Sequence, residues 1–154
     1  MKGMSNMNDE KHCNPEIYTK IWRNLISIYK VLYKEVETKF NENNVTVLEY
    51  RILRILNEKG RMTMASLAEE NYVTQAWITG MIDKMESRGL VVRTRSDTDR
   101  RVIYISATDE GQKFIERIRI VHDQILAETF SFMDEKRAEK ILLILEDLKT
   151  DLER

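Results

Sequence analysis

The chain has 154 residues, a length that predicts one domain with room for a buried core. Charged residues make up 33% and hydrophobic residues 42%, with five glycines and one proline, which is typical of a helical, soluble protein. One cysteine excludes an internal disulfide, no apolar run approaches the ~20 residues that span a membrane, and the polar start lacks the core of a signal peptide, so we expect a cytoplasmic protein.

The first helix is predicted to follow a flexible N-terminal tail over residues 1–13. Asn14 is a suitable N-cap and Pro15 suits the first turn, and apolar residues then recur at helical spacing to about Phe40. Aromatic side chains follow one edge of this apolar stripe: Tyr18, Trp22, Tyr29, Tyr33 and Phe40. We expect such a stripe to pack in a core or against a second copy of the chain.

The sequence Thr46-Val47-Leu48-Glu49 is a capping box, which predicts the start of a second helix. This helix is expected to end at Gly60, because glycine favours the conformation that closes a helix. Arg61 and Met62 follow it and are candidates for a short strand beside a later hairpin.

Two short helices joined by a turn are predicted between Thr63 and Gly89. Thr63 and Thr74 are suitable N-caps, and Gly89 suits the end of the second helix. We expect the first helix to end near Asn71, with asparagine taking the left-handed conformation of the turn. Two helices separated by about three residues are the pattern of a helix-turn-helix.

The second of these helices has two different faces. An apolar face is predicted, at about 100° per residue, for Ile78, Met81, Ile82 and Met85. The opposite face is small and polar, as a helix in a DNA major groove must be, and consists of Ala76, Thr79, Gly80, Asp83 and Ser87. Trp77 lies beside the apolar face, where a large ring is either half-buried against a neighbouring helix or laid along the DNA backbone. We favour half-burial, because tryptophan is usually mostly buried.

A β-hairpin follows this helix. Leu90–Arg95 and Val102–Ser106 are rich in strand-forming residues, with Arg100 and Arg101 opening the second strand, and Ser96–Asp99 is the predicted turn. Between Lys84 and Arg101 there are six basic and three acidic residues, whereas the whole chain has a formal net charge of −1. Beside a helix-turn-helix, this local basic surplus indicates a surface for nucleic acid.

Two more amphipathic helices complete the chain. Thr108 caps the first, Asp109 and Glu110 suit its positive N-terminal end, and a break is expected near Ser131–Asp134. The last helix carries apolar residues at near-heptad spacing: Ile141, Leu142, Leu145, Leu148 and Leu152. Helices this long cannot all bury their apolar stripes in so small a monomer, so we expect self-association.

Residues Val45–Ile118 resemble the MarR (multiple antibiotic resistance regulator) family of winged-helix transcription factors. The matching segments are VTVLEYRILRIL, TMASLAEE, VTQAWITGMIDKMESRGLVVR, the wing signature Asp99-Arg100-Arg101, and VIYISATDEG, in the expected order. The resemblance implies one mainly α domain over residues 14–154. Its winged helix-turn-helix core, with a small β-hairpin wing, spans residues 45–108, and the helices of residues 14–43 and 109–154 form a dimerisation bundle.

The resemblance further implies a homodimer that binds a pseudo-palindromic DNA operator, with repression expected over activation. The recognition helix would enter the major groove, and Arg101, oriented by Asp99, the minor groove. Gly80 stands where many members carry a basic or polar residue, so base contacts would depend more on Gln75, Ala76 and Thr79. The expected DNA-binding residues are Thr74, Gln75, Ala76, Trp77, Thr79, Gly80, Lys84, Arg93, Arg95, Asp99, Arg100 and Arg101.

Many members of this family bind a small aromatic or lipophilic effector in a crevice beside the first helix. By resemblance, four rings are candidates for the wall of such a site: Tyr18, Trp22, Tyr29 and Tyr33. Binding of an effector at this site would change the affinity of the protein for DNA. Plain packing of the same rings in a core or dimer is the alternative.

The sequence lacks the motifs of an enzyme, because it has no Gly-rich phosphate loop and no nucleophile signature. His12, Cys13 and His122 match no usual metal-ligand spacing, so we expect neither a metal nor another cofactor. Cys13 precedes the first helix and has no second cysteine, which favours a thiol without function over a redox sensor. The alternative to a DNA-binding regulator is a winged-helix module that docks on protein, and the basic wing argues against it.

Overall fold

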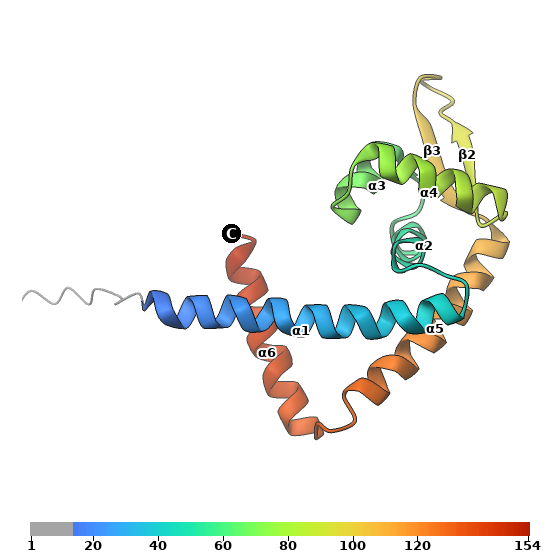
Figure 1. Ribbon diagram of the computed structural model, residues 1–154. Coiled ribbons are helices and arrows are strands. Elements are labelled where there is room, and N and C mark those ends of the chain that lie inside the picture. Colours follow the sequence, from blue (N-terminus) through green and yellow to red (C-terminus); the bar gives the residue numbers. More distant parts are fainter. Residues whose placement is uncertain (1–13) are drawn as a thin grey trace, which may run out of the picture. The chain divides into compact units, whose positions relative to one another are not determined.

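The structure, a computed structural model, describes residues 14–154 (Figure 1). The tail expected over residues 1–13 lies outside them, as do His12 and Cys13. The chain divides after Lys34 into two units, and the described part of the first unit is a single stretch of helix. The sheet and the other helices therefore belong to the second unit.

Over residues 14–154 most of the chain is helical and the strands are short, which confirms the predicted mainly α fold. The helices are α1 (Pro15–Glu42), α2 (Val47–Lys59), α3 (Met64–Asn71), α4 (Gln75–Ser87), α5 (Asp109–Thr129) and α6 (Glu135–Leu152). The strands are β1 (Met62–Thr63), β2 (Val91–Arg95) and β3 (Ile103–Ala107). Together α3 and α4 form the predicted helix-turn-helix, and β2 and β3 form the wing.

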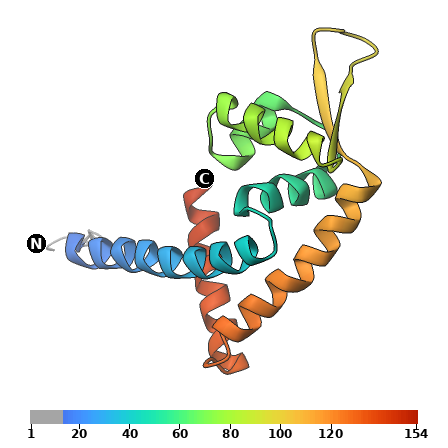
Figure 2. The ribbon, with the colours of Figure 1, turned by 45° about the vertical axis from the view of Figure 1, so that its right-hand side comes forward.

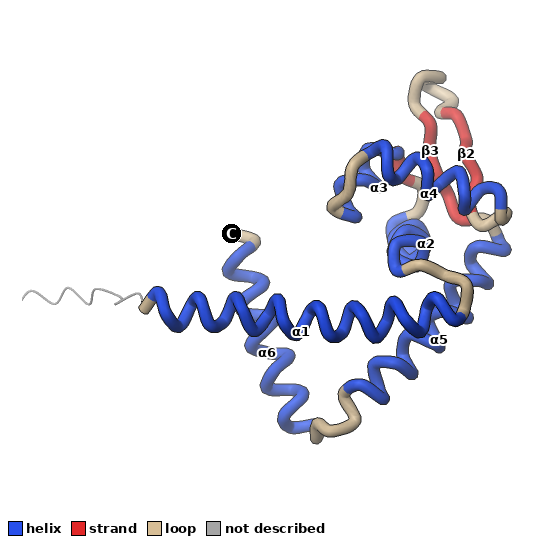
Figure 3. Tube along the Cα trace, viewed as in Figure 1, coloured by secondary structure: helices blue, strands red, loops and turns tan. Residues whose placement is uncertain are grey.

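In the described part of the chain the strands form one antiparallel sheet in the order β1-β3-β2 (Figure 3). Ile105 of the central strand pairs with Met62 on one side and with Arg93 on the other. The short strand predicted beside the hairpin is therefore confirmed, although it extends over Met62–Thr63.

The loop at the end of the wing is longer than the sequence pattern predicts. The pattern places Arg100 and Arg101 at the start of the second strand, but β3 begins only at Ile103. The reason is a turn, in which the Val102 N–H donates to the Asp99 carbonyl oxygen at 2.9 Å before the strand begins. That prediction is wrong, and both arginines lie in the loop at the tip of the wing.

The predicted helix caps are confirmed. At the start of four helices a threonine hydroxyl accepts a backbone N–H, and these threonines are Thr46, Thr63, Thr74 and Thr108. The capping box at Thr46 is complete, because its own N–H donates to Glu49 Oε2 at 2.7 Å. Gly60 ends α2 with a φ of 76°, in the region that glycine adopts without strain.

The turn between α3 and α4 differs from the prediction at one residue. Asn71 is the last residue of α3 and is buried, and its Nδ2 donates to the Leu67 carbonyl oxygen at 2.8 Å. Because the asparagine amide is held inside the helix, the left-handed conformation falls to Tyr72, with a φ of 55°. The tyrosine side chain is 92% exposed.

The core of the second unit lies where α2, α3, α4, the sheet and α5 meet (Figure 2). Ile78, Ile82 and Met85 of α4 are fully buried in it and Met81 lies at its edge, as the helical spacing predicts. Other elements contribute buried residues that include Phe40, Ile52, Leu53, Leu67, Val91, Ile105, Phe114 and Ile118. This packing leaves the opposite face of α4 in solvent.

The last helix contributes nothing to this core. None of the residues of α6 is buried, and its predicted apolar row is partly or largely exposed. By contrast, α5 buries Phe114, Ile115, Ile118 and Ile125. Ala127 and Phe130 near the end of α5 and Ile141 and Leu145 of α6 line a hollow of about 550 Å³ that is open to solvent.

Candidate nucleic-acid interface

The outer face of α4 is made of small, exposed side chains. Gln75, Ala76, Thr79 and Gly80 all lie in solvent, so nothing in the described residues blocks their approach to a surface. The Thr79 hydroxyl donates to the Gln75 carbonyl oxygen at 2.8 Å, which leaves its lone pairs available to an outside donor. A helix with such a face fits a major groove.

Trp77 lies beside this face and is 60% exposed. The prediction that it is half-buried against a neighbouring helix is wrong, because most of the residue lies in solvent. At the same end of α4, the N-cap hydroxyl of Thr74 accepts the Trp77 N–H at 3.3 Å. Tyr72, in the turn before α4, is also exposed.

Asp99 and Arg101 form an ordered pair at the tip of the wing. Arg101 donates to Asp99 from Nε and Nη2, each at 3.2 Å, and from its backbone N–H at 3.0 Å. These hydrogen bonds lower the pKa of the Asp99 carboxyl below its ordinary value. The Arg101 side chain remains 91% exposed, so it is oriented without being covered. The pairing implied by the resemblance is present, and its contact with DNA stays a prediction.

Arg93, at the base of the wing, has a different environment. Its guanidinium bonds to Asp83 at 2.5 Å and also to Glu86, both on α4, and its side chain is only 25% exposed. Burial acts to lower the pKa of Arg93, but the hydrogen bonds to the two carboxylates raise it above the ordinary value. The two carboxylates therefore offset the charge of Arg93, and the arginine links β2 to α4.

The base of the wing is also attached to the start of α5. The Thr108 N–H donates to the Leu90 carbonyl oxygen at 3.1 Å, and its hydroxyl donates to the Gly89 carbonyl oxygen at 2.6 Å. At Gly111 a side-chain Cβ would lie 2.0 Å from the Leu90 oxygen, which leaves room for glycine alone. Both ends of the hairpin thus meet at one fixed point.

The remaining residues predicted to contact phosphate differ in whether they already have a partner within the protein. Arg95 and Arg100 are exposed near the tip of the wing, and neither forms an ion pair with another described residue. Lys84 is half-exposed on α4, and its Nζ lies 3.6 Å from Glu49 Oε1. The six cations that look alike in the sequence therefore differ in how far each is already paired.

Two residues near this surface were not singled out by the sequence pattern. Glu49 is fully buried, and it bonds at 2.7 Å to Arg88, the residue that caps the end of α4. Its capping-box position signals the bond to Thr46, but not a partner 39 residues away. Tyr72 carries no signal, because an exposed tyrosine in a left-handed turn follows no residue preference.

The four candidate effector residues lie on α1. Within the first unit, Tyr18, Trp22 and Tyr29 are exposed on a single helix. The Tyr29 ring lies 5.6 Å from the ring of Tyr33, centroid to centroid. These rings share an edge of the helix, as predicted, and their role in ligand binding stays a prediction.

His122, in α5, lies among aromatic rings. It stacks on Tyr50 at a centroid distance of 5.1 Å and approaches Phe40 at 6.0 Å. Burial raises the pKa of Tyr50.

In the part of the chain that the structure describes, no group of three or more histidine, cysteine or acidic residues is placed to hold a metal ion. Nor does any helix of that part have the length and apolarity needed to cross a membrane.

Comparisons with known proteins agree with this geometry. The family model described as "MarR family" matches residues 45–103. The chain is 30% identical over 128 residues to the HTH-type transcriptional regulator FarR of Neisseria gonorrhoeae, across 83% of this chain and 85% of that protein. It is 28% identical over 121 residues to the HTH-type transcriptional repressor MdtR of Bacillus subtilis, across 79% and 78% of the two chains.

A solved structure gives a similar result. The transcriptional regulator BldR from Sulfolobus solfataricus superposes with a TM-score of 0.78 at 26% identity, over 90% of this chain and 99% of that chain. The likeness extends beyond the helix-turn-helix and wing to most of the flanking helices.

Proposed function

The chain belongs to the MarR family of DNA-binding transcriptional regulators, and from that premise we propose that it represses transcription by binding a pseudo-palindromic operator as a homodimer. The observation that carries the proposal is the exposed, small face of α4 together with an Arg101 that is 91% exposed and held by Asp99. One feature suits the major groove and the other suits the narrow minor groove beside it.

Within this proposal the contacts fall into three groups. Gln75, Ala76 and Thr79 contact base edges, with Thr74, Trp77 and Gly80 flanking them. Arg101 enters the minor groove, with Asp99 fixing its orientation. Arg95 and Arg100 hold phosphates, and Lys84 adds to them once it leaves Glu49. Because Arg93 is balanced by two carboxylates, it is the weakest candidate for a phosphate contact.

The homodimer is supported by the exposed apolar row of α6. Leucine and isoleucine side chains along 18 residues of helix favour burial against a second copy of the chain. A two-fold symmetric dimer would present two α4 helices to half-sites about one turn of DNA apart. Repression then follows from occupation of the operator, in the cytoplasm, where the DNA lies.

An effector would act by changing the separation of the two recognition helices. The aromatic edge of α1, formed by Tyr18, Trp22, Tyr29 and Tyr33, supports a small aromatic or lipophilic compound as that effector. Rings of this kind offer apolar faces with polar tips, which suit a ligand of the same character.

The test is selection of bound duplexes from a random-sequence DNA library, followed by titration of the winning duplex and a scrambled copy at two salt concentrations. We expect enrichment of a two-fold symmetric sequence, saturation at one dimer per duplex, and a preference over the scrambled copy that persists at the higher salt. Equal, weak binding to both duplexes that disappears with salt would contradict the proposal and favour a protein-docking module.

A further inference from the structure

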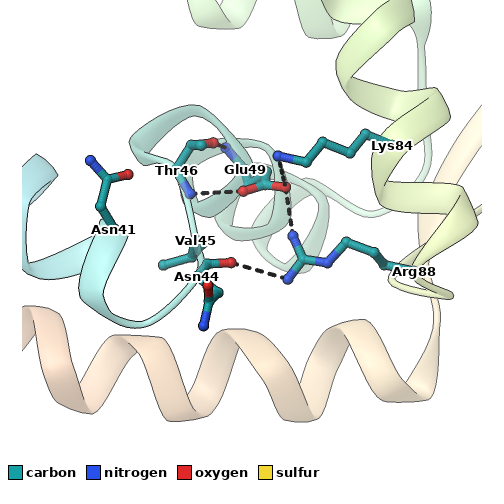
Figure 4. Close-up of a pocket in the computed structure, with 7 residues that line it drawn as sticks. All are labelled: Asn41, Asn44, Val45, Thr46, Glu49, Lys84 and Arg88. Atoms are coloured by element: carbon teal, nitrogen blue, oxygen red, sulfur yellow. Dashed lines mark hydrogen bonds and ion pairs between the residues drawn. The ribbon is translucent and has the colours of Figure 1, made fainter.

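A buried carboxylate connects α2 to the recognition helix. Glu49 is 0% exposed, and its two oxygens have different partners (Figure 4). Oε2 accepts the Thr46 N–H at 2.7 Å, which completes the helix cap. Oε1 accepts Arg88 Nη1 at 2.7 Å and lies 3.6 Å from Lys84 Nζ, and both of these cations belong to the end of α4.

Arg88 extends the connection to two further segments. Its Nη2 donates to the Asn44 carbonyl oxygen at 3.3 Å, and its guanidinium lies 5.3 Å from the centroid of the Phe114 ring in α5. Asn44 has a left-handed backbone with a φ of 56°, and its carbonyl oxygen faces the arginine. One guanidinium thus joins the end of α4 to α2, to the loop before α2, and to α5.

Stability alone does not account for this arrangement. Removing a carboxylate from water is costly, and apolar side chains of similar size often stabilise a protein as well as a buried ion pair does. The helix cap at Thr46 needs only one oxygen of Glu49. An ion pair that links two helices through a planar guanidinium does, however, restrict how one helix lies against the other.

Lys84 differs from Arg88 in how firmly it is held. Its Nζ is at the outer limit of an ion pair, its side chain is 56% exposed, and it lines a cavity of about 420 Å³ that is open to solvent. The lysine therefore has room to leave Glu49 for a phosphate, whereas Arg88 is bonded on two sides.

We propose that Glu49 is a positioning residue for DNA recognition: through Arg88 it sets the orientation of α4, and through Lys84 it offsets positive charge that would otherwise attract any duplex. This inference rests on the proposed function, since it concerns the choice between a matching and a non-matching duplex. Glu49 itself does not touch DNA, because it is fully buried.

The test is the substitution Glu49→Gln, in which an amide of the same shape keeps an oxygen for the Thr46 N–H and removes the charge. We expect the affinity ratio between the selected and the scrambled duplex to fall by about tenfold. Affinity for the scrambled duplex should rise, and its salt dependence should steepen by up to about 0.9 in log–log slope, because Lys84 is released. Loss of packing alone would not increase non-specific binding.

Glu58→Gln is the matched control. It makes the same change of charge on the same helix, but Glu58 is exposed and, among residues 14–154, forms an ion pair with Arg54 alone, one turn earlier, at 3.1 Å. We expect its affinity ratio to equal that of the wild type. An unchanged ratio in Glu49→Gln, or an equal fall in both variants, would overturn the proposal.

Two further measurements test the inference if Glu49→Gln folds poorly or if the wild-type protein selects no DNA sequence. Arg88→Lys keeps the charge but loses the planar fork, and it should also lower the affinity ratio. Amide hydrogen exchange without DNA should be faster near the end of α4 in Glu49→Gln and Arg88→Lys than in Glu58→Gln. Unchanged exchange in both variants overturns the inference, whereas a wild type that selects no sequence overturns only the proposed function.

Discussion

The two ends of the wing use the same kind of residue in opposite ways. At the base, Arg93 is bonded to two acids of α4 and is mostly covered. At the tip, Arg101 is bonded to one acid, Asp99, and is almost entirely in solvent. The base is further fixed by Thr108, which donates to the Gly89 and Leu90 carbonyl oxygens.

The comparison shows that a count of basic residues does not measure a DNA-binding surface. An arginine balanced by two carboxylates in the protein gains little from a phosphate, because it must first give up those partners. An exposed arginine oriented by one acid loses little side-chain freedom on binding. The base of the wing should therefore determine stability and the tip should determine affinity.

The largest effect should come from breaking the base. In Gly111→Ala the new Cβ would lie 2.0 Å from the Leu90 carbonyl oxygen, so the backbone of β2 or α5 must move. We expect the free energy of unfolding to fall by about 3 kcal/mol, measured by urea denaturation. The control is Gly80→Ala, where an added Cβ would meet no atom within 4 Å apart from the neighbouring backbone of its own helix, and a helical alanine should stabilise by about 0.5 to 1 kcal/mol. Equal stability of the two variants would contradict the clash.

The next effect should appear only at the tip. Arg101→Ala should weaken binding to the selected duplex by about thirtyfold, near 2 kcal/mol, and lower the salt slope by about 1. The melting temperature should fall only slightly, because the side chain is exposed and its pair with Asp99 contributes little to stability. Arg119→Ala, which removes an exposed arginine paired with Glu116 in α5, should leave DNA binding as it is. If both variants bind equally well, the tip is not a DNA contact.

For Arg93→Ala we expect a smaller effect than for Arg101→Ala, and one on stability rather than on the salt dependence of DNA binding. Removing this cation leaves Asp83 and Glu86 without their shared partner, so the free energy of unfolding should fall by about 1 kcal/mol. The salt slope of DNA binding should stay close to that of the wild type, because the charge was already balanced. A salt slope reduced as much as in Arg101→Ala would show that Arg93 does contact phosphate.

The smallest effect concerns pH. Hydrogen bonds from Arg101 lower the folded-state pKa of Asp99 below its ordinary value of 3.8. The pair therefore adds stability above about pH 4, and this contribution is lost as the pH falls through the lowered pKa. Because the wing tip is exposed, the expected difference in melting temperature between wild type and Asp99→Asn is small at pH 6 and should vanish once the pH is below the lowered pKa of Asp99. A difference that grows toward low pH would contradict this sign.

Local rules predicted the parts of the fold that depend on neighbouring residues. The threonine caps, the apolar face of α4 and the end of α2 at Gly60 follow from spacing and from the preference of each residue type. The same rules identified the exposed face of α4, whereas the pair of Asp99 and Arg101 at the wing tip was expected from the resemblance to the MarR family.

Errors occurred where a distant part of the chain decides the outcome. Whether Trp77 is covered depends on how far the neighbouring elements extend, which no residue near it specifies. The bond between Glu49 and Arg88 joins positions 39 residues apart, so neither residue reveals it. The conformation of Tyr72 follows from the inward bond of Asn71, a choice that spacing does not determine.

The junction of Gly89, Leu90 and Thr108 has a consequence for how this surface can evolve. The chain leaves α4 and reaches α5 19 residues later, yet the two points are joined by a hydrogen bond of 2.6 Å. The hairpin lies between these two points, and no other element of the second unit rests on its tip. Insertions, deletions or new side chains at its tip can therefore change which DNA is preferred while the helices keep their places, which makes the tip a site where new specificities arise at little structural cost.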